Sequence, residues 1–445
     1  MSAQETIDVT DYIDRRTFNA FNFQLVVVSF LVIMVDGFDI TVAAFAVPPL
    51  IKAWGVQNPG AFGPVLGASL FGMLFGAPLL GHIGDRLGRK TAILTSYVVF
   101  GVFTLSAAWS SSILELGILR FFAGIGIGGL LPNVVALNAE FAPRRLQATA
   151  VIVSFAGITL GGSLPGPIAA YLVPHYGWPI LFYFGGLVPL LLAGLIATSL
   201  PESIRYLALK DRQADVAALI QRMDPGTKPP AGARFVVHMG EKLPFRYLFT
   251  GKLAVMTPLL WVLFVVNLMA YFFLVSWMPT LLASTSMPSQ AALATAVLQI
   301  GGFLGALGIA LPLDRYGMLP VVALFALAIP VVGAIGFFAQ RSEVELMAVV
   351  ALAGFCTLGT QFGINAISAI LYPTALRSTG SGAAFGIGRV GAILGPVIGG
   401  RLIDMHLPVQ QLYMIAAIPF VIGAITALIM MPMFAERMRT HGPGR

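Results

Sequence analysis

The sequence predicts an all-α polytopic membrane protein with about twelve membrane-spanning helices in two pseudo-symmetric halves of six helices each. Three observations support this prediction. Of the 445 residues, 58% are hydrophobic and only 10% are charged, whereas charged residues make up about 25% of soluble domains. Apolar runs of bilayer length recur along the chain. Short motifs of the first half return in the second half at an offset of about 230 residues.

Each expected span is an apolar run long enough to cross the hydrocarbon core, which takes about 20 helical residues. The runs lie at 25–48, 62–80, 91–109, 113–139, 148–172, 178–200, 254–279, 292–311, 319–339, 346–371, 380–403 and 412–434. The polar segment before the first run lacks the basic start and the small-residue cleavage site of a signal peptide. We therefore expect this segment to be retained.

Basic residues predict the orientation of the spans. They gather in alternate connections, at 86–90, 144–145, 205–252, 377 and 437–439, and the positive-inside rule places these connections in the cytoplasm. The one long polar connection is proline-containing and separates six spans from six, as expected of a linker. We predict a multi-pass inner membrane protein with both termini cytoplasmic. Its expected divisions are a cytoplasmic segment 1–21, an N-terminal half 22–200, a cytoplasmic linker 201–253, a C-terminal half 254–435 and a cytoplasmic tail 436–445.

Several functional classes find no support in the sequence. Cys356 is the only cysteine and the five histidines are scattered, so we expect no disulfide, metal site or cofactor. Neither a nucleophile with a base nor a phosphate-binding loop occurs, which argues against an enzyme and against nucleotide-driven chemistry. The formal charge of +7 comes from the loops and does not indicate a nucleic acid partner. We expect a monomer in the lipid bilayer.

Two acids lie inside the first apolar run. Asp36 and Asp39 are three residues apart and share one face of a helix. Each carboxylate at membrane depth costs about 2.5–3.5 kcal/mol, and acids in this position usually mark an ion, proton or substrate path. The alternative is that both acids lie in headgroup water at the helix end or form a purely structural pair.

The internal repeat favours a transporter. The Asp85-Arg86-Leu-Gly88 run after the second span matches Asp314-Arg315-Tyr-Gly317 after the eighth, and similar matches follow spans four and ten and lie within spans five and eleven. Two parallel six-helix repeats are the architecture of secondary transporters that rock about a site between the halves.

The loop after the second span carries the most specific motif. Gly81-His-Ile-Gly84-Asp85-Arg86-Leu-Gly88-Arg89-Lys90 places an acid near a helix end beside a basic cluster, and it resembles the G-x-x-x-D-R-x-G-R-[RK] signature of the major facilitator superfamily. We expect this loop to act as a gate between the halves. The predicted gating residues are Asp85, Arg86, Gly88, Arg89, Asp314 and Arg315, together with a cytoplasmic salt bridge between Glu140 and Arg144.

Arg120 begins a run, Arg120-Phe-Phe-Ala-Gly124-Ile-Gly126, that resembles the R-x-x-x-G-x-G motif of the same superfamily. Small residues at this spacing allow close helix packing. A buried arginine needs an acid, so Arg120 is a candidate partner for Asp36 or Asp39, and breaking such a pair would make a proton switch. Alternatively, Arg120 extends to the headgroups from a helix end.

The Asp36-Gly37-Phe38-Asp39 run, with the Pro201-Glu202-Ser203 segment after the sixth span, narrows the resemblance. It is similar to the aromatic acid:proton symporter family, whose first helix carries D-G-[YF]-D. The resemblance implies import of benzoate-type or hydroxybenzoate-type carboxylates with protons. The resemblance also implies functional roles for Asp36, Asp39, Asp85, Arg89 and Arg389. Phe38 stands where that family often has tyrosine, which affects substrate preference rather than coupling.

Candidate substrate contacts lie in several spans. Arg389 sits in an apolar run with no acid nearby in sequence, so a substrate carboxylate is a natural partner, although an acid of another span is the alternative. Tyr271, Gln361 and Asn365 offer an aromatic ring beside amide groups, which suits a polar-substituted aromatic ring. The predicted substrate-binding set is Asp39, Arg389, Tyr271, Gln361, Asn365 and Phe38, and the proton-coupling set is Asp36, Asp39 and Arg120.

The leading hypothesis is a proton-coupled importer of small aromatic carboxylates that works by rocker-switch alternating access. A symporter of another organic or sugar acid, or a proton-driven exporter, remains an alternative because the fold alone does not fix the substrate or the direction.

Overall fold

The computed structural model describes residues 6–14, 16–224, 234–237, 243–284 and 291–441. Within these ranges, twelve helical segments are long and apolar enough to cross a membrane, which confirms the predicted fold class. The first six are α2 (Ala20–Trp54), η1 (Pro59–Phe62) with α3 (Gly63–Leu87), α4 (Arg89–Ser106) with η2 (Ala107–Trp109), α5 (Ile113–Gly128) with α6 (Leu130–Phe141), α7 (Arg144–Ser163) with α8 (Pro165–Tyr176), and α9 (Pro179–Ser199). The last six are α12 (Leu253–Ala283), α13 (Ala291–Tyr316), α14 (Leu319–Phe338), α15 (Glu343–Leu371), α16 (Thr374–Asp404), and α17 (Val409–Ala416) with α18 (Ile418–His441).

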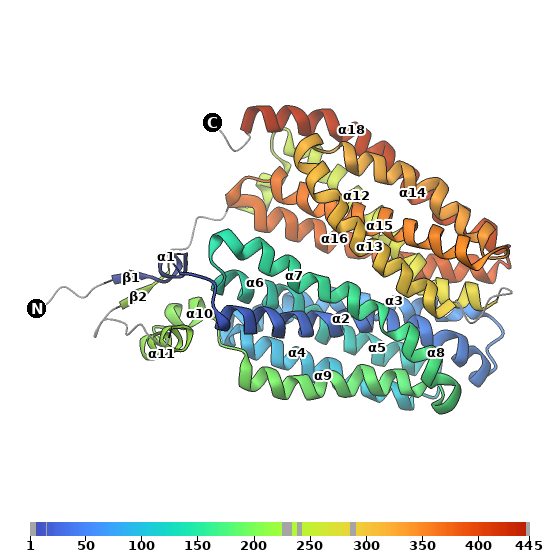
Figure 1. Cartoon of the computed structure of the whole chain (residues 1–445), viewed down its shortest axis with the longest axis horizontal. Coiled ribbons are helices and arrows are strands. Elements are labelled where there is room, and N and C mark those ends of the chain that lie inside the picture. Colours follow the sequence, from blue (N-terminus) through green and yellow to red (C-terminus); the bar gives the residue numbers. More distant parts are fainter. Residues whose placement is uncertain (1–5, 15, 225–233, 238–242, 285–290, 442–445) are drawn as a thin grey trace, which may run out of the picture.

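The helices form two bundles that follow the order of the chain (Figure 1), with α2 to α9 in one and α12 to α18 in the other. Both ends of the chain lie at the same end of the molecule as α10 and α11 of the connection between the bundles (Figure 1). We call this the linker end and the opposite one the far end.

Glycines bring equivalent helices together in both halves. A Cβ atom on Gly72 or Gly76 of α3 would lie 2.0 Å from a carbonyl oxygen of α5, and one on Gly124 of α5 would lie 2.0 Å from the carbonyl oxygen of Ser69. Three further helix pairs show the same arrangement. Gly301 and Gly354 join α13 to α15, Gly37 and Gly161 join α2 to α7, and Gly391 and Gly395 join α12 to α16. Any other residue at these positions would place its Cβ atom on the neighbouring backbone, so only glycine permits this approach. Small residues at helix contacts are typical of membrane proteins, where helices associate by close packing. The two halves therefore share one packing scheme.

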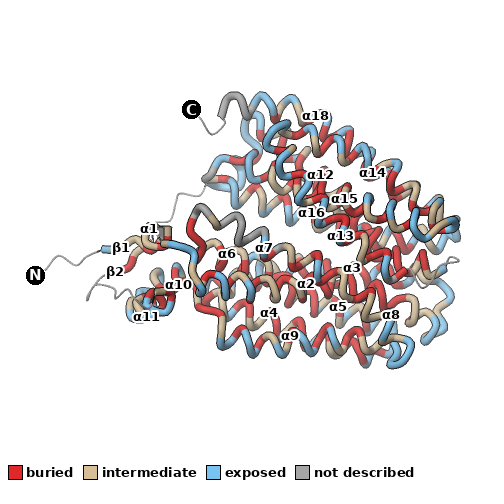
Figure 2. Tube along the Cα trace, in the orientation of Figure 1, coloured by how far each residue is buried: buried red, intermediate tan, exposed pale blue. Residues whose placement is uncertain are grey.

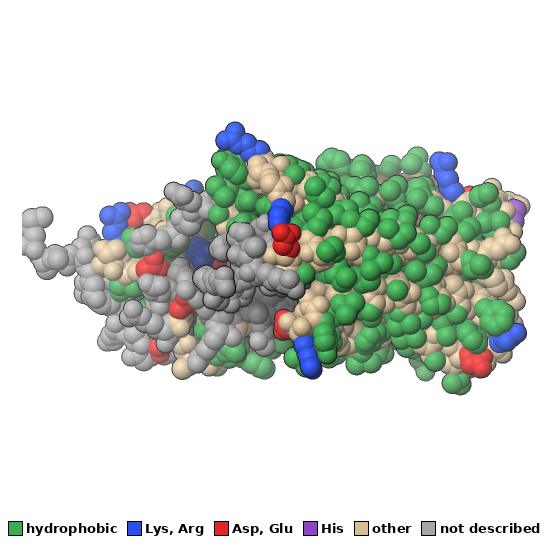
Figure 3. Space-filling view, turned by 90° about the horizontal axis from the view of Figure 1, so that it is seen from above, with side chains coloured by type: hydrophobic (Ala, Val, Ile, Leu, Met, Phe, Trp, Pro, Cys, Tyr) green, Lys and Arg blue, Asp and Glu red, His purple; other side chains and the backbone are tan. Residues whose placement is uncertain are grey.

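The surface matches a bilayer environment. Buried residues face the interior of each bundle in Figure 2, and apolar side chains cover the broad middle of the face in Figure 3, with charged ones towards its ends. Large apolar residues such as Leu114, Leu191 and Leu311 are at least 74% exposed. Exposure of this size over many helices is expected where lipid covers the protein.

The linker end carries a small folded unit where the sequence predicted only a terminal segment and a linker. Strand β1 (Thr6–Asp8) pairs in parallel with β2 (Arg234–Val236). Around this sheet lie α1 (Val9–Asp14), α10 (Ile204–Leu209) and α11 (Gln213–Met223), and η3 (Phe245–Phe249) precedes α12. Val9, Ile13, Leu219 and Phe235 are buried in one hydrophobic cluster. The apolar cluster and an ion pair of 3.0 Å between Arg16 and Asp224 fasten the linker to the N-terminal segment.

The halves contact each other towards the far end. A Cβ atom on Gly63 of α3 would lie 2.9 Å from the carbonyl oxygen of Pro396 of α16, and one on Gly67 would lie 3.3 Å from that of Ile393. Nearer the linker end, Gly81 of α3 and Gly386 of α16 have no such neighbour within 4 Å. The two helices therefore meet over their far-end portions and separate towards the linker, which is also the direction in which the bundles diverge in Figure 1.

We expect Gly124→Val to lower the free energy of unfolding by about 1–3 kcal/mol, the usual cost of overpacking. The added Cβ would meet the backbone of α3, which has little room to shift. The measurement is thermal unfolding in detergent. Gly194→Val is the matched control, because a Cβ atom there meets nothing within 4 Å. Equal stability of the two variants would contradict the proposed packing role.

Candidate functional site

A buried ion pair lies at the centre of the N-terminal half. Arg120 of α5 donates from Nη1 and Nη2 to the two carboxylate oxygens of Asp39 of α2, at 2.5 and 2.6 Å. Both side chains are at most 2% exposed. Arg120 also donates to the backbone oxygen of Asp39 at 3.2 Å. This bidentate geometry is the strong form of an arginine–carboxylate contact, and it selects Asp39 from the two partners that the sequence left open.

The pair owes its position to the packing of three helices. Ser69 of α3 donates its hydroxyl to Asp39 at 3.3 Å. The glycine contacts between α3 and α5 bring Ser69 and Arg120 to the same height, since Gly124 lies one helical turn beyond Arg120 and packs on Ser69. Ser69 was not predicted from the sequence, because a serine in an apolar span carries no signal of its partner.

Asp36 is also fully buried but has no hydrogen-bond partner for either carboxylate oxygen among the described residues. The two acids predicted to share a face thus have different surroundings. Asp39 is held by Arg120, while the buried Asp36 carboxylate has no hydrogen-bond partner among the described residues.

Arg389 comes from α16 of the other half and is half-buried. Its Nη1 atom donates to the backbone oxygen of Met73 of α3 at 2.8 Å. This hydrogen bond lies at the inner edge of the contact between α3 and α16, between the packed far-end portions and the separated linker-end portions. Among the described residues, no acid forms a salt bridge with Arg389, so a negatively charged ligand would meet an unneutralised guanidinium.

Amide and hydroxyl groups of the C-terminal half form two short chains. Tyr271 of α12 donates its hydroxyl to Gln299 of α13 at 2.8 Å. Asn267 donates to Gln361 at 2.9 Å, and Gln361 donates to Asn365 at 2.9 Å. The structure thus links the predicted Gln361 and Asn365 and gives Tyr271 a partner, Gln299, that sequence reasoning missed.

Gln299 also reaches the N-terminal half. Its amide nitrogen lies 2.2 Å from the position that a Cβ atom on Gly162 of α7 would take. Phe38, by contrast, packs within its own half, with its ring 3.3 Å from the Cβ position of Gly185 of α9. A substrate-binding role for Phe38 stays a prediction, and its location favours packing.

The loop that carries the motif from Gly81 to Lys90 forms a polar cluster at the linker end of the N-terminal half. Arg89 pairs with Glu140 of α6 at 3.0 Å and with Asp85 at 3.6 Å. The other oxygen of Glu140 accepts a hydrogen bond from Ser203. Glu140 therefore has Arg89 as its partner, whereas the side chain of Arg144, the partner predicted from the sequence, lies outside the described residues.

Glu202 completes this cluster. Its carboxylate accepts from the backbone N–H of Lys90 at 3.1 Å, at the N-terminal end of α4, where a negative charge is favourable. Gly88 has a φ of 104°, and a Cβ atom there would lie 2.2 Å from the Glu202 carboxylate. Glycine is thus required by both conformation and space. Glu202 and Ser203 belong to the segment quoted for the resemblance, but nothing in the sequence alone revealed these contacts.

The remaining gate residues make few contacts in this conformation. Arg86, Asp85, Asp314 and Arg315 are exposed. Arg315 lies over the ring of Tyr316 at 5.2 Å. Their gating roles stay predictions, because the halves are apart at this end.

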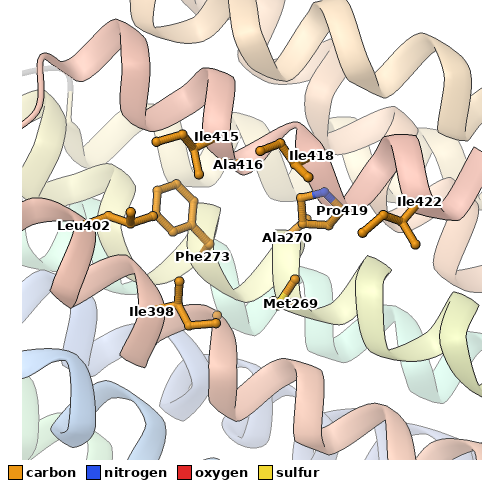
Figure 4. Close-up of a pocket in the computed structure, with 11 residues that line it drawn as sticks. Met269, Ala270, Phe273, Ile398, Leu402, Ile415, Ala416, Ile418, Pro419 and Ile422 are labelled. Atoms are coloured by element: carbon orange, nitrogen blue, oxygen red, sulfur yellow. The ribbon is translucent and has the colours of Figure 1, made fainter.

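A cavity of about 170 Å³ opens within the C-terminal half. Its lining comes from α12, α16, α17 and α18 and includes Met269, Phe273, Leu402 and Pro419 (Figure 4). All of its side chains are apolar, so it offers no donor for a carboxylate. In the described part of the chain, no group of three or more His, Cys, Asp or Glu is placed to hold a metal ion.

Comparison with known families identifies the architecture. The model of the Major Facilitator Superfamily matches residues 29–384. The chain belongs to the major facilitator superfamily. Among solved structures, the xylose transporter XylE from E. coli, in a partially occluded inward-open conformation, matches with a TM-score of 0.69 and 17% identity, covering 93% of this chain and 98% of that one. This likeness shows the shared fold of a multi-pass membrane protein.

Curated relatives cover nearly the whole chain. A gallate transporter of Pseudomonas putida is 36% identical over 95% of this chain and 94% of its own. The 4-hydroxybenzoate transporter PcaK of Pseudomonas putida is 33% identical over 96% of both. A benzoate transport protein of Acinetobacter baylyi is 32% identical over 95% of this chain and 92% of its own. These relatives confirm the resemblance to aromatic acid transporters of this superfamily.

We expect Ser203→Ala to lower the free energy of unfolding by about 1–3 kcal/mol, because it leaves one oxygen of the buried Glu140 carboxylate without a donor. The measurement is thermal unfolding in detergent. Ser106→Ala is the control, since this exposed hydroxyl bonds only within its own helix. The Ser203→Ala substitution should cost less stability in a Glu140→Gln background than in the wild-type protein. An equal cost in both backgrounds would show that the loss does not come from the Glu140 carboxylate.

Proposed function

We propose that this protein imports small aromatic carboxylates together with protons by alternating access. The observation that carries the proposal is the buried Asp39–Arg120 pair with Asp36 one helical turn away, whose carboxylate has no hydrogen-bond partner among the described residues. Relatives of the same length are named as transporters of gallate, 4-hydroxybenzoate and benzoate. Charged residues buried in membrane spans usually mark an ion, proton or substrate path, and transporters of two repeated halves bind substrate between the halves near the midplane.

In this proposal, Asp36 carries the proton. An ionised carboxylate without a partner is very costly to bury, whereas a neutral carboxyl group is far less so. Asp39, in contrast, is compensated by Arg120 and can stay charged. The two acids are one helical turn apart, so a proton on Asp36 removes the repulsion that it would otherwise exert on Asp39.

Arg389 is the proposed contact for the substrate carboxylate. Its guanidinium holds a backbone oxygen of the opposite half with one nitrogen, and its other donors suit a planar carboxylate. The hydroxyl and amide groups of Tyr271, Gln299, Gln361 and Asn365 are the proposed partners for ring substituents. A carboxylate that bridges Arg389 to the N-terminal half would couple binding to the position of the halves.

Charge balance supports coupling to at least one proton. Moving one charge across 100 mV takes about 2.3 kcal/mol, so a monoanion entering a negative interior is opposed unless a proton accompanies it. We propose an inner membrane location, with the linker end in the cytoplasm because the basic loops lie there, and a monomer as the working unit.

Uptake into proteoliposomes with an inward proton gradient tests the proposal. We expect gradient-dependent uptake of benzoate, 4-hydroxybenzoate or gallate, with Asp39→Asn and Arg389→Lys each lowering it at least about ten-fold. The first removes the buried charge that pairs with Arg120, and the second keeps a positive charge but replaces the planar guanidinium, which can bind a carboxylate through two nitrogens. Arg401→Lys, an exposed position on the same helix as Arg389, is the control and should transport normally.

Uptake restricted to gluconate or shikimate would keep the fold and replace the substrate class. Outward transport driven by the gradient would instead assign an exporter. Normal uptake by both Asp39→Asn and Arg389→Lys would remove the proposed mechanism, whatever the substrate.

A separate prediction concerns the gate loop. Asp85 is 72% exposed and lies 3.6 Å from Arg89, so Asp85→Asn should leave thermal stability within about 0.5 kcal/mol, as for surface changes. Uptake should nevertheless fall several-fold, because the proposed partners of Asp85 act only when the linker end closes. Asp211→Asn, an exposed acid of the linker, is the control. Unimpaired uptake by Asp85→Asn would count against the gate.

A further inference from the structure

A polar contact joins the two halves at the far end. The backbone N–H of Gly60, in η1 before α3, donates to Oδ1 of Asp404 at 2.9 Å. Asp404 is the last residue of α16. This donor and this acceptor are 344 residues apart in the chain, and they move apart whenever the halves separate here.

Backbone packing surrounds this contact. A Cβ atom on Gly60 would lie 2.1 Å from the carbonyl oxygen of Gly400, and one on Gly400 would lie 2.6 Å from that of Gly60. Gly60 does not adopt a positive φ, so its requirement for glycine is one of space and not of conformation. The far end is closed by two backbones that touch.

The hydrogen bond has a physical reason to favour the closed arrangement. The second span begins at η1, where the first backbone N–H groups have no acceptor within the helix. Asn58 at the N-cap position makes no side-chain hydrogen bond to them. Asp404 supplies an acceptor from the other half, and its negative charge suits the positive end of a helix. Among the described residues, Asp404 forms no salt bridge, and its carboxylate accepts the hydrogen bond from Gly60.

We propose that Asp404 stabilises closure of the transport path at the end opposite the linker by holding Gly60 across the two halves. The contact exists only while this end is closed, so it biases the equilibrium between the two orientations of the carrier. Gly60 and Gly400 make the contact possible because their backbones can approach. This inference rests on the alternating-access part of the proposed function and on neither the substrate nor the proton.

Two substitutions should open the far end by different routes. Asp404→Ala removes the acceptor. Gly60→Ala keeps the acceptor but places a methyl group against Gly400 and the Asp404 carboxyl group. Asp404→Asn keeps an oxygen acceptor without the charge, so its effect should be smaller than that of Asp404→Ala. Because Asp404 is exposed to solvent, we expect a shift of about three- to ten-fold in the equilibrium.

Thiol labelling of purified full-length protein in detergent measures this shift. Cys356, the only native cysteine, is changed to serine, and Val397→Cys is the reporter. Val397 of α16 lies against α3 at the far end, with its Cγ2 atom 3.5 Å from the Cβ position of Gly67. Val397 is half-buried in this arrangement, so a water-soluble maleimide should label this position faster when the two helices separate. We expect labelling to be about three- to ten-fold faster with Asp404→Ala or Gly60→Ala.

Gly333→Ala is the matched control, because a Cβ atom there meets nothing within 4 Å, and it should label at the wild-type rate. Thermal unfolding of each variant separates gate opening from loss of the fold, and Asp404→Asn replaces Asp404→Ala should the latter unfold. Wild-type labelling in the Asp404 variants overturns the proposal even if Gly60→Ala labels faster. The assay needs no substrate, so its result stands apart from any failure of aromatic acid uptake.

Discussion

The buried ion pair between Asp39 and Arg120 is the constraint on which the N-terminal half depends. Removing one partner of such a pair costs about 3–5 kcal/mol, since the other charge is left buried and alone. Gly72, Gly76 and Gly124 bring α3 and α5 close together, which places Ser69 and Arg120 beside Asp39 of α2. The glycines of α3 and α5 therefore help to hold the side chains that surround the buried ion pair in place.

The second half repeats the packing scheme without the pair. Gly301 and Gly354 join α13 to α15 as their counterparts join α3 to α5, yet this half places amides and hydroxyls where the first places charges. The first half thus encloses an ion pair, and the second encloses hydrogen bonds between neutral side chains. Arg389 is the exception, since it contributes a cation of the C-terminal half to the boundary.

The hydrogen bonds between the two halves are unevenly distributed among the described residues. Arg389 and Met73 meet at its inner edge, and Gly60 and Asp404 meet at the far end. The linker-end cluster of Arg89, Glu140 and Ser203 lies wholly within the N-terminal half and its following segment. Separation at the far end would therefore break the hydrogen bond of Gly60 with Asp404 and the packing of α3 on α16, while the contacts within each bundle stay intact.

The sequence by itself determined the twelve spans, the two repeated halves and the family, because hydrophobic run length and motif spacing are local properties. It also pointed to Asp36, Asp39, Arg120 and Arg389, since charges in apolar runs are costly and hence conspicuous. Only the tertiary structure decided that Arg120 holds Asp39, while Asp36 has no hydrogen-bond partner among the described residues. It also decided that Glu140 contacts Arg89, and it revealed the hydrogen bonds of Ser69, Gln299 and Asp404. These pairings depend on helix rotation and close approach, which residues distant in the chain fix together.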